Sequence, residues 1–129
     1  MSTSVHQEIT FAASPERIYH AYMDSSEHAA FTANGEASIS PDEGGAFSCH
    51  GGAILGRQIE LVPNKRIVQA WRVGDWEPGL YSLVCITLIP DSDGTKVVLD
   101  HTGLPEGHAE HIASGWHARY WDPLRKYLA

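Results

Sequence analysis

The sequence predicts an α+β fold in which a curved antiparallel sheet wraps around a long C-terminal helix. Three observations support this. Short alternating segments fill the middle of the chain, two helix-capping signals follow the first such segment, and an apolar stripe with helical spacing ends the chain. We expect six to seven strands, two short helices after the first strand, and one domain over residues 1–129.

The N-terminal part predicts one strand and two helices. Apolar and polar residues alternate over residues 5–11, which is typical of a half-buried strand. Ser14-Pro15-Glu16 begins a helix, because serine caps the first turn, proline suits the first helical position and an acid favours the positive end of the helix dipole. Asp24-Ser25-Ser26-Glu27 is a second capping signal and begins a short helix that runs through Phe31.

The middle of the chain predicts six further strands, separated by clusters of Gly, Asn, Asp and Pro that favour turns. The expected strands are Glu36–Ser40, Ala46–Cys49, Ile54–Val62, Ile67–Val73, Tyr81–Ile89 and Lys96–Thr102. The glycine pairs at 44–45 and 51–52 suit bends or bulges, which would let the sheet curve around a helix.

The segment from about Glu106 to Leu128 predicts the long helix. Its apolar stripe comprises Ile112, Trp116, Tyr120, Leu124 and Tyr127. Pro123 conflicts with this helix because it lacks an N–H and crowds the preceding turn. We expect either a kink near Asp122 or a restart with Asp122 as the cap.

The alternation within strands also predicts which side chains face the helix. Gln69 and Trp71 should point inward and Arg72 outward, since a face that ends in a charge is the solvent side. His101 should point inward near the end of its strand, and the terminal helix should bring Trp116 to Trp71. The strand Tyr81–Ile89 is apolar on both faces, so its second face lies either beside loops or against a second copy in a homodimer.

Composition excludes several classes of function. Nine basic against 16 acidic residues give a net charge of −7, which argues against nucleic-acid binding. The chain has no apolar run long enough for a membrane span and no recognisable signal peptide at its start. Two cysteines, at 49 and 85, do not form a disulfide framework, so we expect a cytoplasmic protein.

Motif searches identify no catalytic residues, and we expect neither a metal nor a cofactor. His108, His111 and His117 do not share one helix face, and the chain has no HExxH or CxxC spacing. Cys49 and His50 are neighbours on an expected strand, so their side chains should point to opposite faces and form no activated pair. The nucleophile-elbow and phosphate-loop patterns are absent as well.

The predicted interior combines large rings with a few polar groups, which is typical of a small-molecule pocket and also of an ordinary core. The candidate ligand-binding residues are Trp71, Gln69, His101, Trp116, Arg119, Tyr120, Phe31 and Tyr22. Trp71, Trp116 and Tyr120 would supply apolar walls. Gln69 and His101 would orient a polar group of the ligand, and Arg119 would lie at the rim.

Four ordered motifs resemble one family, which is named for activators of the heat-shock chaperone ATPase. They are Ser14-Pro15-Glu16, His28-Ala29-Ala30-Phe31-Thr32, the run from Gly56 to Arg72, and Gly115-Trp116-His117-Ala118-Arg119-Tyr120-Trp121. The resemblance covers about Val5 to Leu128. The chain most resembles the C-terminal domain of the eukaryotic co-chaperone. In that domain, too, a strand starts with an aromatic segment like Asp75-Trp76-Glu77-Pro78-Gly79.

This resemblance implies a helix-grip fold, shared with START-like lipid-binding domains, aromatic polyketide cyclases and the birch-pollen allergen. It implies no shared set of catalytic residues. Three hypotheses follow. The chain binds a hydrophobic or aromatic small molecule between sheet and helix, or it is a cyclase- or hydratase-type enzyme that uses His101 as acid and base, or it binds a heat-shock chaperone.

Overall fold

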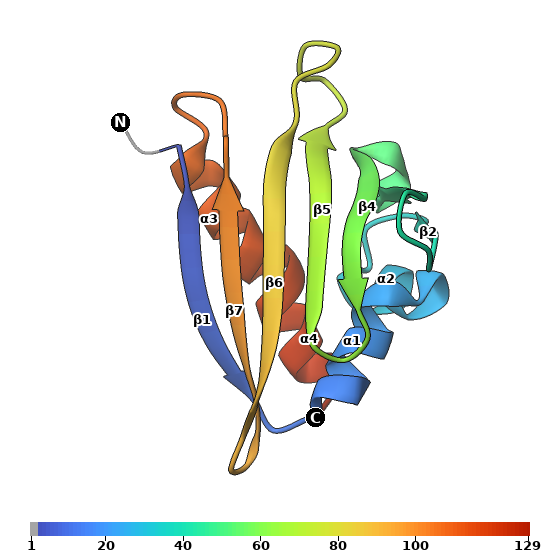
Figure 1. The fold of residues 1–129 in the computed structure, drawn as a ribbon, viewed down its shortest axis with the longest axis vertical. Coiled ribbons are helices and arrows are strands. Elements are labelled where there is room, and N and C mark those ends of the chain that lie inside the picture. Colours follow the sequence, from blue (N-terminus) through green and yellow to red (C-terminus); the bar gives the residue numbers. More distant parts are fainter. Residues whose placement is uncertain (1–2) are drawn as a thin grey trace.

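In the computed structural model, which describes residues 3–129, seven antiparallel strands form one sheet in the order β1-β7-β6-β5-β4-β3-β2. The strands are β1 (Val5–Phe11), β2 (Ser38–Ile39), β3 (Ala46–Cys49), β4 (Ile54–Val62), β5 (Arg66–Val73), β6 (Ser82–Asp91) and β7 (Gly94–Thr102). The helical elements are α1 (Pro15–Met23), α2 (Ser25–Thr32), η1 (His50–Gly52), α3 (Ala109–Trp116), η2 (His117–Trp121) and α4 (Asp122–Tyr127). These elements confirm the predicted fold class and the predicted order of strands and helices (Figure 1).

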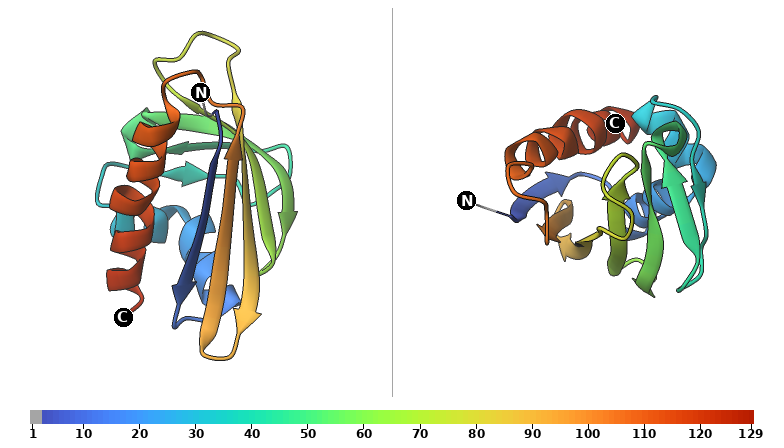
Figure 2. Two further views of the ribbon diagram at one scale, coloured as in Figure 1. Left: turned by 90° about the vertical axis from the view of Figure 1, so that its left-hand side faces the viewer. Right: turned by 90° about the horizontal axis from the view of Figure 1, so that it is seen from above.

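The helices all lie on the concave side of the sheet. α3, η2 and α4 follow one another in a single long rod beside the strands, while α1 and α2 cover the end of the sheet near the β4–β5 turn (Figures 1 and 2). The sheet therefore grips the C-terminal rod, as the sequence predicts. Among the described residues, no helix is both long and apolar enough to cross a membrane.

The two N-terminal capping signals form as predicted. The Ser14 hydroxyl accepts a hydrogen bond from the Arg17 N–H at 3.2 Å, and the Asp24 carboxylate accepts one from the Glu27 N–H at 3.0 Å. Each cap satisfies a donor that the first helical turn leaves without a partner. Because α1 ends and α2 begins at Asp24, the chain changes direction there without a loop.

The C-terminal rod accommodates Pro123 by a change of helical geometry before the proline. α4 begins at Asp122, but Asp122 has helical dihedral angles (φ −67°, ψ −48°) and Trp121 is the N-cap, so the expectation that Asp122 caps the segment is wrong. Instead the rod adopts π-helical geometry over His117–Trp121, with the Asp122 N–H bonded to the carbonyl of His117. This wider turn precedes the proline, whose ring would otherwise crowd the carbonyl of Arg119.

The side chains predicted to face inward are buried, as expected, but the prediction that Arg72 is exposed to solvent is wrong. Gln69 and Trp71 are 1% and 4% exposed, and His101 is fully buried. Arg72, expected in solvent, is only 9% exposed because the loop after β5 folds over it. Its Nη atoms donate to the carbonyls of Gly74, Trp76 and Glu77, so a charged side chain holds the loop in place.

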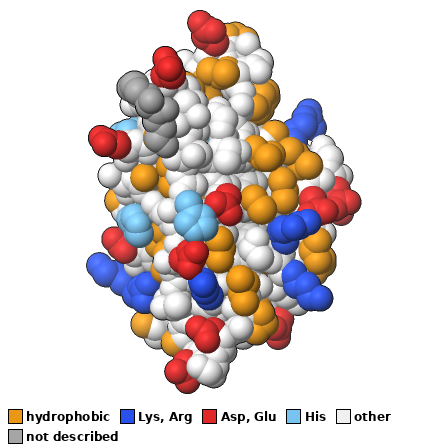
Figure 3. Space-filling model, turned by 60° about the vertical axis from the view of Figure 1, so that its left-hand side comes forward, with side chains coloured by type: hydrophobic (Ala, Val, Ile, Leu, Met, Phe, Trp, Pro, Cys, Tyr) orange, Lys and Arg blue, Asp and Glu red, His pale blue; other side chains and the backbone are white. Residues whose placement is uncertain are grey.

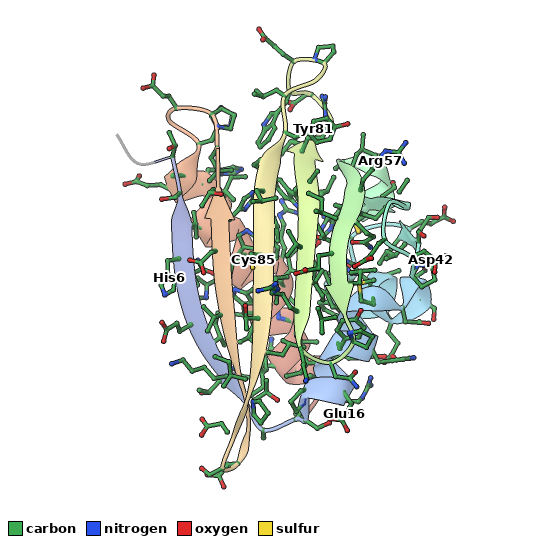
Figure 4. All side chains as sticks on the ribbon, viewed as in Figure 1. His6, Glu16, Asp42, Arg57, Tyr81 and Cys85 are labelled. Carbon is green, nitrogen blue, oxygen red and sulfur yellow. The ribbon has the colours of Figure 1, made fainter. Side chains whose placement is uncertain are left out.

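The outer face of the sheet carries several exposed apolar side chains. Tyr81, immediately before β6, is 48% exposed, Leu83 and Ile89 of β6 are 42% and 43% exposed, and Ile59 of β4 is 50% exposed. Tyr81 lies at the start of β6 and Cys85 near its middle, in the centre of the sheet (Figure 4). Hydrophobic side chains alternate with acidic and basic ones on the side of the molecule in Figure 3.

Candidate functional site

The interior is built around indole rings from different elements. Trp71 of β5 and Trp116 of α3 stack with ring centroids 6.3 Å apart and an interplanar angle of 29°. Trp76, from the loop after β5, contacts Trp71 edge-on at 5.8 Å. The predicted meeting of Trp71 and Trp116 is therefore confirmed, and the alternation of β5 and the stripe of α3 together produce it.

A cavity of about 370 Å³ opens beside these rings. It lies between the end of β5 with its following loop, the η1–β4 segment, and the α3 and η2 part of the rod. Four of the candidate residues line it, namely Trp71, Trp116, Arg119 and Tyr120. Sequence reasoning missed further lining residues, which include Asn34, His50, Asp75, Trp76, His108, His111 and Gly115.

Gly115 is the reason that the cavity reaches the helix backbone. It lies in α3, and a Cβ atom built on it would meet no heavy atom within 4 Å. Glycine in the interior of a helix costs about 1 kcal/mol relative to alanine. The chain therefore has its smallest residue at a helical position where a larger side chain would enter the cavity.

A chain of hydrogen bonds runs from the cavity into the core. His28 Nδ1 donates to the backbone carbonyl of Tyr22 at 2.8 Å, so its Nε2 accepts the Tyr120 hydroxyl proton at 3.1 Å. His50 Nε2 then donates to the Tyr120 oxygen at 2.9 Å, and His50 Nδ1 accepts from the Asn34 amide at 3.2 Å. Both histidines are neutral in this arrangement, and burial lowers the pKa of His28 to about 4.

His50 reaches Tyr120 because the backbone turns immediately after β3 ends at Cys49. Its φ of +55° lies in the left-handed region, and Gly51 and Gly52 continue the turn with φ of 66° and 97°. The expectation that Cys49 and His50 point to opposite faces is therefore wrong, because both side chains are buried and His50 hydrogen-bonds Tyr120, whose hydroxyl also influences the Cys49 thiol. The adjacent glycine pair was the available signal for this turn. Burial raises the pKa of the Cys49 thiol to about 12, so it is not an activated nucleophile.

His101 has a structural role beneath the cavity rather than a place in its wall. The indole N–H of Trp116 donates to His101 Nδ1 at 3.0 Å, so Nε2 carries the proton and donates to the Ser82 hydroxyl at 2.7 Å. That hydroxyl in turn donates to the Trp71 carbonyl at 3.0 Å. Burial lowers the pKa of His101 to about 4. With both nitrogens engaged by protein groups, His101 offers no support for acid–base chemistry in the cavity.

The remaining candidates lie in the packed core. The Tyr22 hydroxyl donates to Gln69 Oε1 at 3.1 Å, and the Gln69 amide donates to Gln58 Oε1 at 3.1 Å. Phe31 packs against Tyr120 with ring centroids 6.1 Å apart. Tyr22, Gln69, Phe31 and His101 do not line the cavity. The buried polar groups that made Gln69 a candidate therefore satisfy one another.

Burial and a nearby charge both act on the titratable groups of the cavity. Burial is the main cause of the lowered pKa of His50, and the nearby charge of Arg119 lowers it further. His108 contacts the Trp76 ring edge-on at 6.1 Å. Within residues 3–129, no three His, Cys, Asp or Glu side chains come together as a metal site.

Comparisons with known proteins place the chain in a family. The model for activator of Hsp90 ATPase homolog 1-like proteins matches residues 12–129. The human activator of 90 kDa heat shock protein ATPase homolog 1 is 30% identical over 117 residues, which are 91% of this chain and 34% of the human one. The Dictyostelium discoideum homologue is 34% identical over 116 residues, covering 89% and 30%. The chain thus spans about a third of the length of these curated relatives.

Solved structures agree with this assignment. The crystal structure of an Hsp90 activator from Plasmodium falciparum has a TM-score of 0.93 and 25% identity, and the match covers 98% of this chain and 96% of that one. The solution structure of the Aha1 dimer from Colwellia psychrerythraea has a TM-score of 0.76 and 21% identity, covering 90% and 89%, and shows the fold alone. With its helix-grip architecture and a family match over nearly its whole length, the chain belongs to the activator of Hsp90 ATPase homolog 1-like family.

Proposed function

We propose that the chain binds a hydrophobic or aromatic small molecule in the cavity between the sheet and α3. The observation that carries this proposal is a cavity of about 370 Å³ beside three indole rings, with a glycine on its helical wall. Ligand pockets typically occupy about 300–1,000 Å³ and combine aromatic walls with a few placed polar groups. Asn34, His50 and Arg119 supply polar groups of this kind.

A neutral aromatic probe tests this proposal. N-Phenyl-1-naphthylamine gains fluorescence on entering an apolar site, so a titration yields its Kd. Gly115→Leu fills the cavity without a clash at Cβ and should raise that Kd at least about tenfold through loss of apolar contact area. Ser114→Leu is the matched control, because it adds the same side chain one residue earlier at an exposed position.

Two results would contradict the proposal. Saturable binding could be missing from the wild-type chain, or Gly115→Leu could bind the probe as tightly as Ser114→Leu does. Circular dichroism and a thermal midpoint for each variant establish that both are folded before their Kd values are compared.

A second function is favoured by the comparisons. We propose that the chain also contacts a 90 kDa heat-shock chaperone and that it works in the cytoplasm. The Plasmodium falciparum structure, named as an Hsp90 activator, matches this chain over 96% of its own length, so a domain of this size alone carries that description. The free thiols of Cys49 and Cys85 agree with a reducing compartment.

The chaperone proposal predicts a complex between the purified chain and the 90 kDa chaperone, together with a changed rate of ATP hydrolysis. Calorimetric titration and a coupled ATPase assay measure the two effects. A chaperone inhibitor that abolishes the measured hydrolysis shows that the activity belongs to the chaperone. Unchanged hydrolysis without detectable binding would overturn this proposal and leave the ligand proposal intact.

The outer face of the sheet is the basis of a third proposal, in which it pairs with a second copy of the chain. Its exposed apolar side chains lie beside charged groups of both signs, such as Lys96 and Glu8, which pair within the chain at 2.9 Å, so two copies related by a twofold axis would bring opposite charges together. Sedimentation velocity should show a dimer that Leu83→Lys converts to monomer. A wild-type monomer at micromolar concentration would contradict this.

A further inference from the structure

We infer that the ligand of the cavity is an aromatic acid, whose anionic group is bound by the guanidinium of Arg119 at the rim. This inference rests on the proposed function, because it concerns the same cavity, and it adds the chemical class of the ligand.

Arg119 differs from the other arginines in having no partner within residues 3–129. Arg17 and Arg66 pair with carboxylates, Arg57 and Arg72 donate to backbone carbonyls, and Arg125 lies over the Phe11 ring. Arg119 forms neither an ion pair nor a hydrogen bond with a described residue, yet it lines the cavity. A guanidinium presents five donors in a planar fork that fits a carboxylate.

Asn34 supplies a second donor to the lining of the cavity. Asn34 uses one amide N–H for His50 Nδ1 and keeps the second. Arg119 lines the same cavity as Asn34, His50 and Tyr120. Asp75, an acidic residue of the lining, belongs to the exposed turn after β5 and forms no ion pair with Arg119. The part of the cavity lined by Asn34, His50 and Arg119 therefore favours a negatively charged group of the ligand.

The apolar part of the ligand has a place one helical turn away. Gly115 precedes Arg119 by four residues, so their backbone positions lie roughly one helical turn apart along the rod, and both residues line the cavity. An aromatic ring over Gly115 would lie beside the indole of Trp116, with its acidic substituent directed at Arg119. A bicyclic aromatic carboxylate has the size and polarity that this arrangement requires.

The test compares 2-naphthoate with 2-naphthamide, which has the same shape without the charge. Isothermal titration calorimetry measures the Kd of each compound for the wild-type chain and for Arg119→Gln, Arg119→Lys and Lys126→Gln. We expect naphthoate to bind about tenfold more tightly than the amide, the size of a charge-assisted hydrogen bond at a partly exposed site. Arg119→Gln should abolish that difference and Arg119→Lys should keep part of it.

Lys126→Gln is the matched control, since it removes the same charge from the same rod outside the cavity. It should leave both Kd values unchanged. Equal binding of acid and amide to the wild type, or an unchanged ratio in Arg119→Gln, would overturn the inference while the proposed function stood. If neither compound binds, the inference is wrong. Loss of N-phenyl-1-naphthylamine binding as well would also remove the proposed function.

Discussion

The two ends of the space between sheet and rod differ in how they are filled. We call the region around Trp121 and Leu124 the filled half, and the region around Trp76 and Gly115 the open half. The filled half leaves a void of about 10 Å³, whereas the open half holds the cavity of about 370 Å³. Both lie on the same sheet and the same rod, so the architecture alone does not create the cavity.

Side-chain size accounts for the difference. In the filled half, Trp121 and Leu124 of the rod are 2% and 1% exposed and pack against branched residues of the strands, including Ile67. In the open half the rod presents Gly115, and the opposite wall is the loop that Arg72 holds over the sheet. Close packing at one end therefore stabilises the fold while the other end stays available for a ligand.

The polar groups of the two halves differ in the same way. Beside the filled half, Tyr22, Gln69 and Gln58 hydrogen-bond one another and are complete without a ligand. In the open half the chain from His28 through Tyr120 to His50 ends at Asn34, beside the unpaired Arg119. A closed network is typical of a core, and one that ends at a cavity is typical of a binding site.

The largest expected effect comes from emptying the filled half. Trp121→Ala removes a ring that stacks on Trp116 at 5.3 Å and a hydrogen bond to Gln7, and it should lower the free energy of unfolding by about 4 kcal/mol. Ile54→Val, on the cavity wall, should cost less than about 1 kcal/mol because its neighbourhood is already open. Urea denaturation measures both changes in the free energy of unfolding. Similar values for the two variants would contradict the difference in packing between the filled half and the open half.

The next effect concerns the buried histidines. The pKa of His28 and that of His101 are each lowered from 6.5 to about 4 by burial, so the unfolded chain takes up these protons first as the pH falls. Their stabilising contribution is complete above pH 6.5 and declines toward pH 4. Between pH 7.5 and 5, each should account for a loss of about 2 kcal/mol.

Urea denaturation at the two pH values measures this loss. His28→Gln should reduce the difference by about 2 kcal/mol, whereas His117→Gln, at an exposed position of the rod, should leave it as in the wild type. An unchanged pH dependence in His28→Gln would show that this histidine is not held neutral in the folded chain.

The smallest effect is expected at Gly115, and its sign is opposite to that of the same substitution at Gly56. Gly115→Ala places a methyl group in open space in a helix, so it should stabilise the chain by up to about 1 kcal/mol while weakening probe binding. Gly56→Ala should destabilise it by about 1–3 kcal/mol, because the new Cβ would lie 2.5 Å from the Phe47 ring and closer still to the Ala70 carbonyl. Thermal midpoints compare the two, and a destabilised Gly115→Ala would mean that the open half is packed.

Local patterns predicted most of the fold. Caps at Ser14 and Asp24 depend on neighbouring residues alone, and the alternation around Trp71 depends on the pleat of one strand, so both could be inferred from the sequence. The π-helical turn before Pro123 and the burial of Arg72 could not. Each depends on what packs against the residue from elsewhere in the chain.

The site was predicted less completely. The sequence pattern predicts the inward face of the strand for Trp71, the apolar helix stripe for Trp116 and Tyr120, and the rim for Arg119. The structure places all four at the cavity. His50 was missed because a left-handed backbone angle, invisible in an alternation pattern, turns it to Tyr120. Gln69 and His101 were chosen as buried polar groups, but their partners Gln58 and Ser82 come from other strands.

The order of strands and helices, and the faces they present, follow from the amino-acid sequence by itself, because periodicity and capping act over a few neighbouring residues. Which part of the interior is filled and which is open was decided only by the tertiary structure. That outcome depends on the volumes of side chains from several elements and on the loop over Arg72. Because these residues are far apart in the sequence, no short stretch of the chain reveals how their volumes combine.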